Sequence, residues 1–161
     1  MMSTHTATVT LPADNQILIE REFDAPKELV WQAFTTPELV RRWWHAGRGE
    51  MTVAEIDLRP GGRWRYAMVV TNGGFEVAFH GEYREVVPHD RIVSTEVFEG
   101  APEAGAAVNT LTLEERGGRT MLTILVEHAS KAARDMHIES GMEDGLQDAL
   151  DLLEQTAAGL S

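Results

Sequence analysis

The sequence predicts an α+β domain in which a curved antiparallel sheet of six or seven strands surrounds a long C-terminal helix, with two short helices after the first strand. Three observations predict this class. Residues 136–157 show helical periodicity. The middle of the chain alternates apolar and polar residues between glycine-rich turns. Two segments that each begin with a proline separate the first strand from the others.

The N-terminal part of the chain predicts a leader, a strand and two helices, in that order. Residues 1–15 are rich in threonine and lack periodicity, so we expect a flexible leader before a single domain at 16–161. Residues 16–23 predict a strand, because Ile17, Ile19 and Phe23 share one face. Pro26 and Pro37 then each predict a helix start, where the missing N–H of proline does no harm.

Six further strands are predicted after the helices, and tight turns connect several of them. Pro60-Gly61-Gly62, Asn72-Gly73-Gly74 and Arg116-Gly117-Gly118 are typical turn sequences. Gly81 predicts a bend or bulge inside one strand. Strands joined by hairpins pair antiparallel. The predicted strands are 51–58, 63–70, 75–87, 91–98, 107–115 and 119–127. Both faces of the last two carry apolar residues, so their inward face is not assigned.

The predicted C-terminal helix separates apolar from acidic residues almost completely. At about 100° per residue, the apolar face is formed by Ile138, Met142, Leu146, Ala149, Leu150, Leu153 and Ala157. Gly141 and Gly145 border this face although glycine weakens a helix interior, and Glu139 projects toward it. All three features are typical of a helix that lines a cavity.

Composition and charge exclude several classes of function. The chain has 161 residues, a formal charge of −12 and no cysteine. The negative charge would repel phosphate backbones, so we expect no nucleic-acid partner. Without cysteine there are no disulfides, and a cytoplasmic location is expected. No apolar run is long enough to span a membrane. The six histidines show no metal-site spacing and no nucleotide-binding motif is present, so we assign no metal, cofactor or catalytic residue.

Several blocks of sequence resemble the START-like, or SRPBCC, superfamily. The first runs from Phe23-Asp24-Ala25-Pro26 through Thr36-Pro37-Glu38-Leu39 to Trp43-Trp44, and Arg59-Pro60-Gly61-Gly62-Arg63-Trp64 continues the similarity. The chain most resembles the group named after activators of the ninety-kilodalton heat-shock protein's ATPase. This resemblance implies a helix-grip fold with a cavity between the curved sheet and the C-terminal helix. Proteins of the superfamily include carriers of hydrophobic ligands and cyclases, so the resemblance implies a fold more than an activity.

We therefore predict that the cavity binds a small hydrophobic or amphipathic molecule. Two alternatives stay open for the same residues: a solid apolar core, and a cyclase or hydrolase in which a carboxylate such as Glu139 or Glu96 transfers protons. The predicted ligand-binding residues are Trp44, Trp64, Tyr66, Met68, Phe79, Glu96, Asn109, Glu139, Met142 and Leu146.

A third hypothesis is a chaperone-related protein-interaction module. Arg41 and Arg42 precede Trp43 and Trp44, so these four residues could form a basic and aromatic patch that attracts an acidic protein partner. The simpler interpretation places both tryptophans in the core and both arginines in solvent. The sequence does not predict an oligomeric state.

Overall fold

The computed structural model describes residues 6–160, and residues 1–5 and 161 lie outside the described part. The described residues form eight strands and four α-helices, with a short 3-10 helix at Pro102–Ala104. The strands are β1 (Thr8–Thr10), β2 (Gln16–Phe23), β3 (Gly49–Ile56), β4 (Arg63–Val70), β5 (Glu76–Val87), β6 (Arg91–Phe98), β7 (Ala107–Arg116) and β8 (Arg119–Glu127). The helices are α1 (Lys27–Thr35), α2 (Pro37–Val40), α3 (Lys131–Glu139) and α4 (Met142–Ala158).

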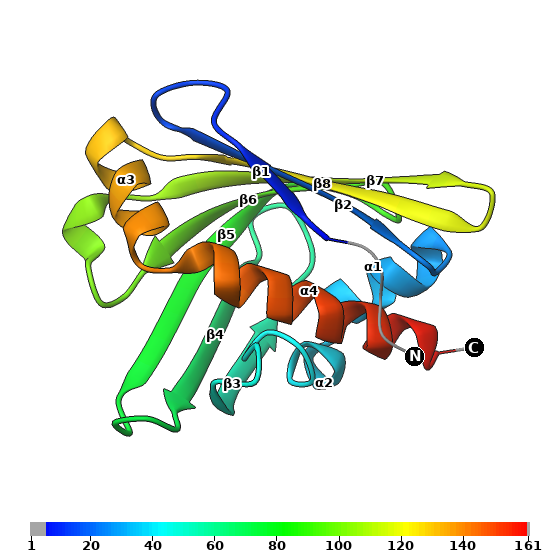
Figure 1. Ribbon diagram of the computed structural model, residues 1–161, viewed down its shortest axis with the longest axis horizontal. Helices are drawn as coiled ribbons and strands as arrows, with labels where there is room; N and C mark the ends of the chain where they lie inside the picture. The colour runs from blue at the N-terminus through cyan, green and yellow to red at the C-terminus, as the bar shows by residue number, and fades with distance from the viewer. Residues whose placement is uncertain (1–5, 161) are drawn as a thin grey trace.

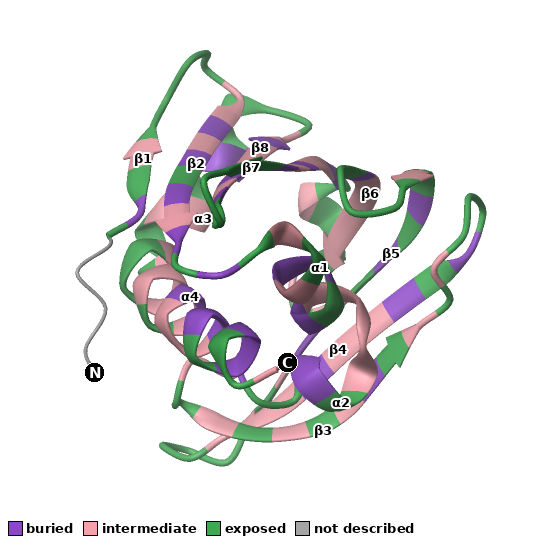
Figure 2. Ribbon diagram, turned by 90° about the vertical axis from the view of Figure 1, so that its right-hand side faces the viewer, coloured by how far each residue is buried: buried purple, intermediate pink, exposed green. Residues whose placement is uncertain are grey.

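The strands form one antiparallel sheet in the order β1-β2-β8-β7-β6-β5-β4-β3. The sheet curls around α4, which crosses its concave side (Figure 1). Seen along α4, the strands pass from β1 over β7 and β6 to β3, and α1 and α2 lie inside the same curve (Figure 2). The predicted fold class is therefore confirmed, with one strand more than the sequence indicates.

The additional strand lies in the segment predicted to be a flexible leader. Thr8–Thr10 form β1 and pair with residues 18–20 of β2. Ala7 is buried and exchanges two hydrogen bonds with the Gln147 side chain of α4, at 3.0 and 2.9 Å. The prediction of a leader is thus wrong for residues 7–10, because three residues are too few to show periodicity. The part of that prediction that concerns residues 1–5 lies outside the described residues.

The register of β7 and β8 settles which of their faces points inward. Asn109 pairs with Val126, Leu111 with Ile124 and Leu113 with Leu122. Ile17 and Ile19 of β2 pair with Val126 and Ile124, and both isoleucines are buried. All of these side chains therefore face α4, whereas Met121, Thr123 and Leu125 lie on the convex face, because neighbouring residues of a strand alternate between faces.

The predicted single helix at 136–157 is divided into α3 and α4. Gly141 separates them in a left-handed conformation, with φ 83°. Ser130 caps α3, because its hydroxyl accepts a hydrogen bond from the Ala133 N–H at 3.0 Å. The prediction of one continuous helix is wrong here, because the apolar spacing continues across Gly141, whose left-handed backbone ends the helical path.

Arg21 of β2 anchors the C-terminal half of α4 to the sheet. Its side chain is fully buried on the concave face, with the guanidinium 4.6 Å from the centre of the Phe23 ring. Asp151 lies 2.7 Å and Glu154 3.6 Å from its terminal nitrogens. Glu154 also accepts a hydrogen bond from the Asp24 N–H, at 2.9 Å. The buried guanidinium thus joins β2 to two carboxylates of α4, and one of them also binds the backbone just after β2.

Two glycine substitutions test the division of the helix. A Cβ would meet nothing within 4 Å at Gly141 or at Gly145, so only the backbone distinguishes the two sites. We expect Gly141→Ala to lower the free energy of unfolding by about 1–2 kcal/mol, because alanine resists a left-handed φ. Gly145→Ala should raise it by about 0.5–1 kcal/mol, because Gly145 lies inside α4. Urea unfolding measures both, and stabilisation by both variants would instead indicate one continuous helix.

The Arg21 anchor predicts unequal effects for its members. Arg21→Met leaves the Glu154 carboxylate, whose side chain is 9% exposed, without its cation, so we expect a loss of roughly 3 kcal/mol or more. Asp151→Asn should cost less than about 1 kcal/mol, although its contact is shorter, because Asp151 is 46% exposed. Chemical denaturation of the two variants measures both losses in the free energy of unfolding. A loss for Arg21→Met as small as that for Asp151→Asn would contradict the anchoring role.

Candidate functional site

A cavity of about 450 Å³ lies between the concave face of the sheet and the N-terminal half of α4. Met142, Gly145, Leu146 and Ala149 form the helix side of the cavity, and Leu150 marks its end. Beyond that point Leu153 and Ala157 are fully buried in the core. One face of α4 therefore packs into a solid core along its C-terminal half and lines a cavity along its N-terminal half.

Nine of the ten predicted ligand-binding residues line this cavity. They come from five elements and from the segment that connects α2 to β3, and they are Trp44, Trp64, Tyr66, Met68, Phe79, Glu96, Asn109, Met142 and Leu146. The tenth, Glu139, is exposed at the end of α3 and does not line the cavity. Its predicted position is wrong because the break at Gly141 interrupts the helical phase that was used to place it.

An aromatic cluster forms the wall opposite α4. The ring of Trp44 meets those of Tyr66 and Phe79 edge to face, with centroids 5.6 and 5.7 Å apart. Trp64 packs on Tyr66 at 4.8 Å, and Phe98 extends the cluster beyond Phe79 at 5.0 Å. Such pairs hold one another in place and present flat apolar surface to the cavity.

Gly81 allows the tryptophan of this wall to reach across a strand. The Trp64 indole N–H on β4 donates to the Thr95 carbonyl on β6, at 3.1 Å, and crosses β5 at Gly81. A Cβ at Gly81 would stand 1.8 Å from that carbonyl oxygen. Glycine is therefore required here, which explains the glycine that the sequence places within a strand.

Glu96 and Asn109 belong to the polar part of the lining, together with Ser94, His137 and Ser140. The Asn109 amide donates to a Glu96 carboxylate oxygen at 3.1 Å. Burial raises the pKa of Glu96, and this hydrogen bond opposes the rise. Burial raises the pKa of both the Tyr66 and the Tyr83 phenol, so both phenols are neutral near pH 7.

A pair of histidines lies at the α3 end of the cavity. His137 lines the cavity, and its Nδ1 lies 3.0 Å from Nε2 of His128, which follows β8. Burial, followed by repulsion from His128, lowers the pKa of His137 to about 4. Burial, followed by Arg134, lowers that of His128. Both rings are therefore neutral near pH 7, and one donates to the other. Sequence reasoning missed this pair because eight residues and a change of direction separate its members.

The structure agrees with the simpler interpretation of Arg41–Trp44, in which the tryptophans are interior and the arginines are in solvent. Trp43 is buried, and its indole N–H donates to the Ala33 carbonyl of α1 at 2.9 Å. Trp44 lines the cavity. Arg41 and Arg42 are exposed, and Arg41 donates to the Met51 carbonyl at 3.2 Å. The two tryptophans thus belong to the interior, and a protein partner at the two arginines stays a prediction.

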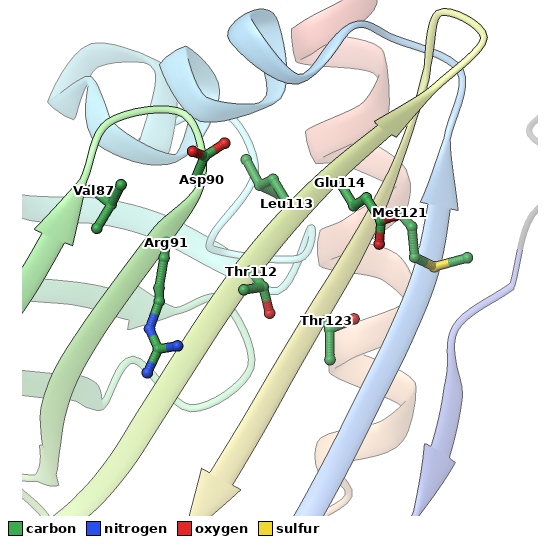
Figure 3. A pocket seen from close by; sticks show the side chains of 8 residues that line it. All are labelled: Val87, Asp90, Arg91, Thr112, Leu113, Glu114, Met121 and Thr123. Carbon is green, nitrogen blue, oxygen red and sulfur yellow. The ribbon is translucent and has the colours of Figure 1, made fainter.

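A second hollow of similar volume lies on the opposite face of the sheet. Figure 3 shows Arg91, Thr112 and Thr123 side by side on β6, β7 and β8, with α4 behind the strands. Val87, Asp90, Arg91 and Glu114 in its lining are exposed to solvent. Five of its eight lining residues are polar or charged, whereas the inner cavity is lined mainly by aromatic and aliphatic side chains. The inner cavity is the better candidate for a small-molecule site.

Two structural findings limit the kinds of site that the described residues form. In this part of the chain, no group of three histidine, aspartate or glutamate side chains is placed to hold a metal ion. Among the helices of residues 6–160, none is long and apolar enough to cross a membrane.

The curved sheet, the C-terminal helix and the cavity between them define a START-like (SRPBCC) protein with a helix-grip fold. The model of the family "Activator of Hsp90 ATPase homolog 1-like protein" matches residues 24–158. The chain therefore belongs to this family, as its opening and Arg-Pro-Gly-Gly motifs indicate.

Solved structures agree with this assignment over nearly the whole chain. A protein from Rhodobacter sphaeroides is 25% identical, with a TM-score of 0.87 over 96% of this chain and 99% of that one. A Mycobacterium smegmatis protein is 25% identical, with a TM-score of 0.85 over 96% and 99%. A Chromobacterium violaceum protein is 29% identical, with a TM-score of 0.76 over 88% and 96%. A search of curated proteins gives no match.

The histidine pair predicts a pH-dependent loss of stability. His137 takes up a proton near pH 4 in the folded protein, whereas an unfolded histidine does so near 6.5. Between these values the unfolded chain binds more protons, so the free energy of unfolding should fall as the pH falls from about 6.5 to 4. His137→Gln should remove about 1–3 kcal/mol of this dependence, as measured by urea unfolding across the range. Titration of the His137 ring near 6.5 by NMR would contradict the prediction.

Proposed function

We propose that this protein binds a small hydrophobic or amphipathic molecule in the cavity between the sheet and α4. The observation that carries the proposal is the cavity itself, at about 450 Å³ and lined mainly by aromatic and aliphatic side chains. This volume lies within the range of small-molecule sites. Proteins of the START-like fold typically bind hydrophobic ligands at this position, which supports the same function.

Energetics also favour a functional cavity over a packing defect. Protein interiors are close-packed, and few voids exceed the size of a water molecule. The cavity between the sheet and α4, at about 450 Å³, is far larger than such voids, and it opens to solvent. A space of this size persists where the surrounding structure holds it open.

Two structural features support an open cavity. The aromatic cluster of Trp44, Trp64, Tyr66 and Phe79 forms a wall whose rings brace one another. The Arg21 anchor fixes the far half of α4, so the near half cannot move onto this wall without disturbing the core. A ligand enters a preformed site, so that little binding energy is lost in ordering side chains.

A cavity-filling substitution tests the proposal. Leu146→Trp places an indole in the cavity, and we expect it to weaken binding of the neutral apolar dye N-phenyl-1-naphthylamine at least tenfold, because the ring occupies the ligand's space. Fluorescence titration of the dye measures the affinity. Gln155→Trp is the matched control, because Gln155 is exposed on the same helix and lies outside the lining.

The control should bind the dye like the unmodified protein, and circular dichroism should show that both variants are folded. Equal weakening in the two variants would locate the dye elsewhere and count against the cavity. A wild-type protein that fails to bind this dye and a panel of lipids and aromatic compounds would overturn the proposed function.

A further inference from the structure

The polar end of the cavity is formed by Glu96 and Asn109. Glu96 lies on β6 and pairs with Ala107, whereas Asn109 lies on β7 and pairs with Ser94. The two side chains are therefore diagonal neighbours on the concave face, and both line the cavity. The aromatic cluster described above belongs to the same lining. The cavity thus combines an aromatic and aliphatic surface with one carboxylate–amide pair, and Ser94, which pairs with Asn109, belongs to the same lining.

The hydrogen bond between these residues fixes which atoms remain for a ligand. Asn109 donates a hydrogen bond from its NH₂ group to one Glu96 carboxyl oxygen, at 3.1 Å. The other amide atom, Oδ1, is buried and accepts no hydrogen bond from any described residue. A buried acceptor without a donor is costly, so this oxygen favours a partner that can donate. The second carboxylate oxygen of Glu96 is also an acceptor.

The charges around the cavity disfavour an anionic ligand. Among the described lining residues, the one arginine or lysine is Arg48, and it already contacts Asp148 at 3.0 Å. His137 is neutral near pH 7, because its pKa is lowered by burial. His45 in the lining accepts a hydrogen bond from the Gly47 N–H through Nδ1, at 2.8 Å. A ligand carboxylate beside Glu96 would therefore be buried in an apolar surrounding without a free cationic partner among the described lining residues.

We propose that Glu96 and Asn109 form a recognition subsite for a hydrogen-bond donor, such as a hydroxyl group, at the polar end of an otherwise apolar ligand. The subsite selects such ligands over their ethers and carboxylates. This inference rests on the proposed function, because it needs a ligand in the cavity. It adds the chemical class of that ligand, which the apolar lining by itself leaves open.

Three naphthalene derivatives test the subsite by isothermal titration calorimetry at pH 7. 2-Naphthol has a donor hydroxyl, 2-methoxynaphthalene replaces that donor with an ether, and 2-naphthoate is an anion. Burial of apolar surface alone favours the ether, which carries one more methyl group. We expect the opposite order, with 2-naphthol bound about 5–30 times more tightly than the ether, because only the hydroxyl satisfies Asn109 Oδ1. 2-Naphthoate should bind most weakly.

Two variants connect this preference to the residues. Asn109→Leu keeps a similar shape and removes the acceptor, so 2-naphthol should lose its advantage over the ether. Glu96→Gln supplies an amide that can donate to Asn109 Oδ1, so it should also reduce the advantage. Thr110→Val is the control, because Thr110 is next to Asn109 on β7 but outside the lining. It should keep the full preference.

The outcomes separate this inference from the proposed function. Equal binding of 2-naphthol and the ether would show that water satisfies Asn109 and would overturn the subsite, while the proposed function would stand. Tightest binding of 2-naphthoate would overturn the subsite in the same way, as would an unchanged preference in both folded variants. Binding of none of the three probes would count against the proposed function itself and would remove the basis of the subsite.

Discussion

The structure depends on the buried cation that joins the first long strand to the last helix. Arg21 stands on the concave face of β2, between Phe23 and the carboxylates of Asp151 and Glu154. Burying one charge is expensive, and the arrangement is stable only while its partners stay in position. The position of α4 over the sheet is therefore fixed by the directional contacts of Arg21 as well as by apolar packing, which is non-directional. A directional contact of this kind defines which half of the helix is packed and which half is not.

The cavity follows from that division of α4. Its C-terminal half, from Leu150 onward, closes the core with α1, while its N-terminal half faces the aromatic wall of β4 and β5 across the cavity. The turn at Gly141 then directs α3 to the end of the cavity, where His137 and Ser140 complete the lining. Rigid packing and open volume are thus placed along one helix, and the strands supply the few polar groups that distinguish one ligand from another.

The sequence predicts the elements and most of the lining well, because both depend on local periodicity. Trp64, Tyr66 and Met68 alternate on one strand, and their inward direction follows from that alternation. The sequence does not show where a helix is interrupted, or which residues far apart in the chain come into contact. Glu139 was misplaced because one left-handed residue, Gly141, ends the helical phase. No spacing in the sequence predicts the contact between His128 and His137 or the pairing of β1 with β2, so only the structure shows them. The motif at Pro26 and Pro37 indicated the family directly.

The order of the strands determines when the fold can be completed during synthesis. β2 has its main partner in β8, and Arg21 has its partners at positions 151 and 154, so both must wait for the last quarter of the chain. Residues 49–98 can meanwhile pair as consecutive hairpins, which are local and fast. Until the C-terminal segment emerges, an apolar strand and its arginine stay exposed, as is typical of states that aggregate or need chaperones. The contacts of β2 with β8 and α4 are thus among the least local of this fold and among the last that can form.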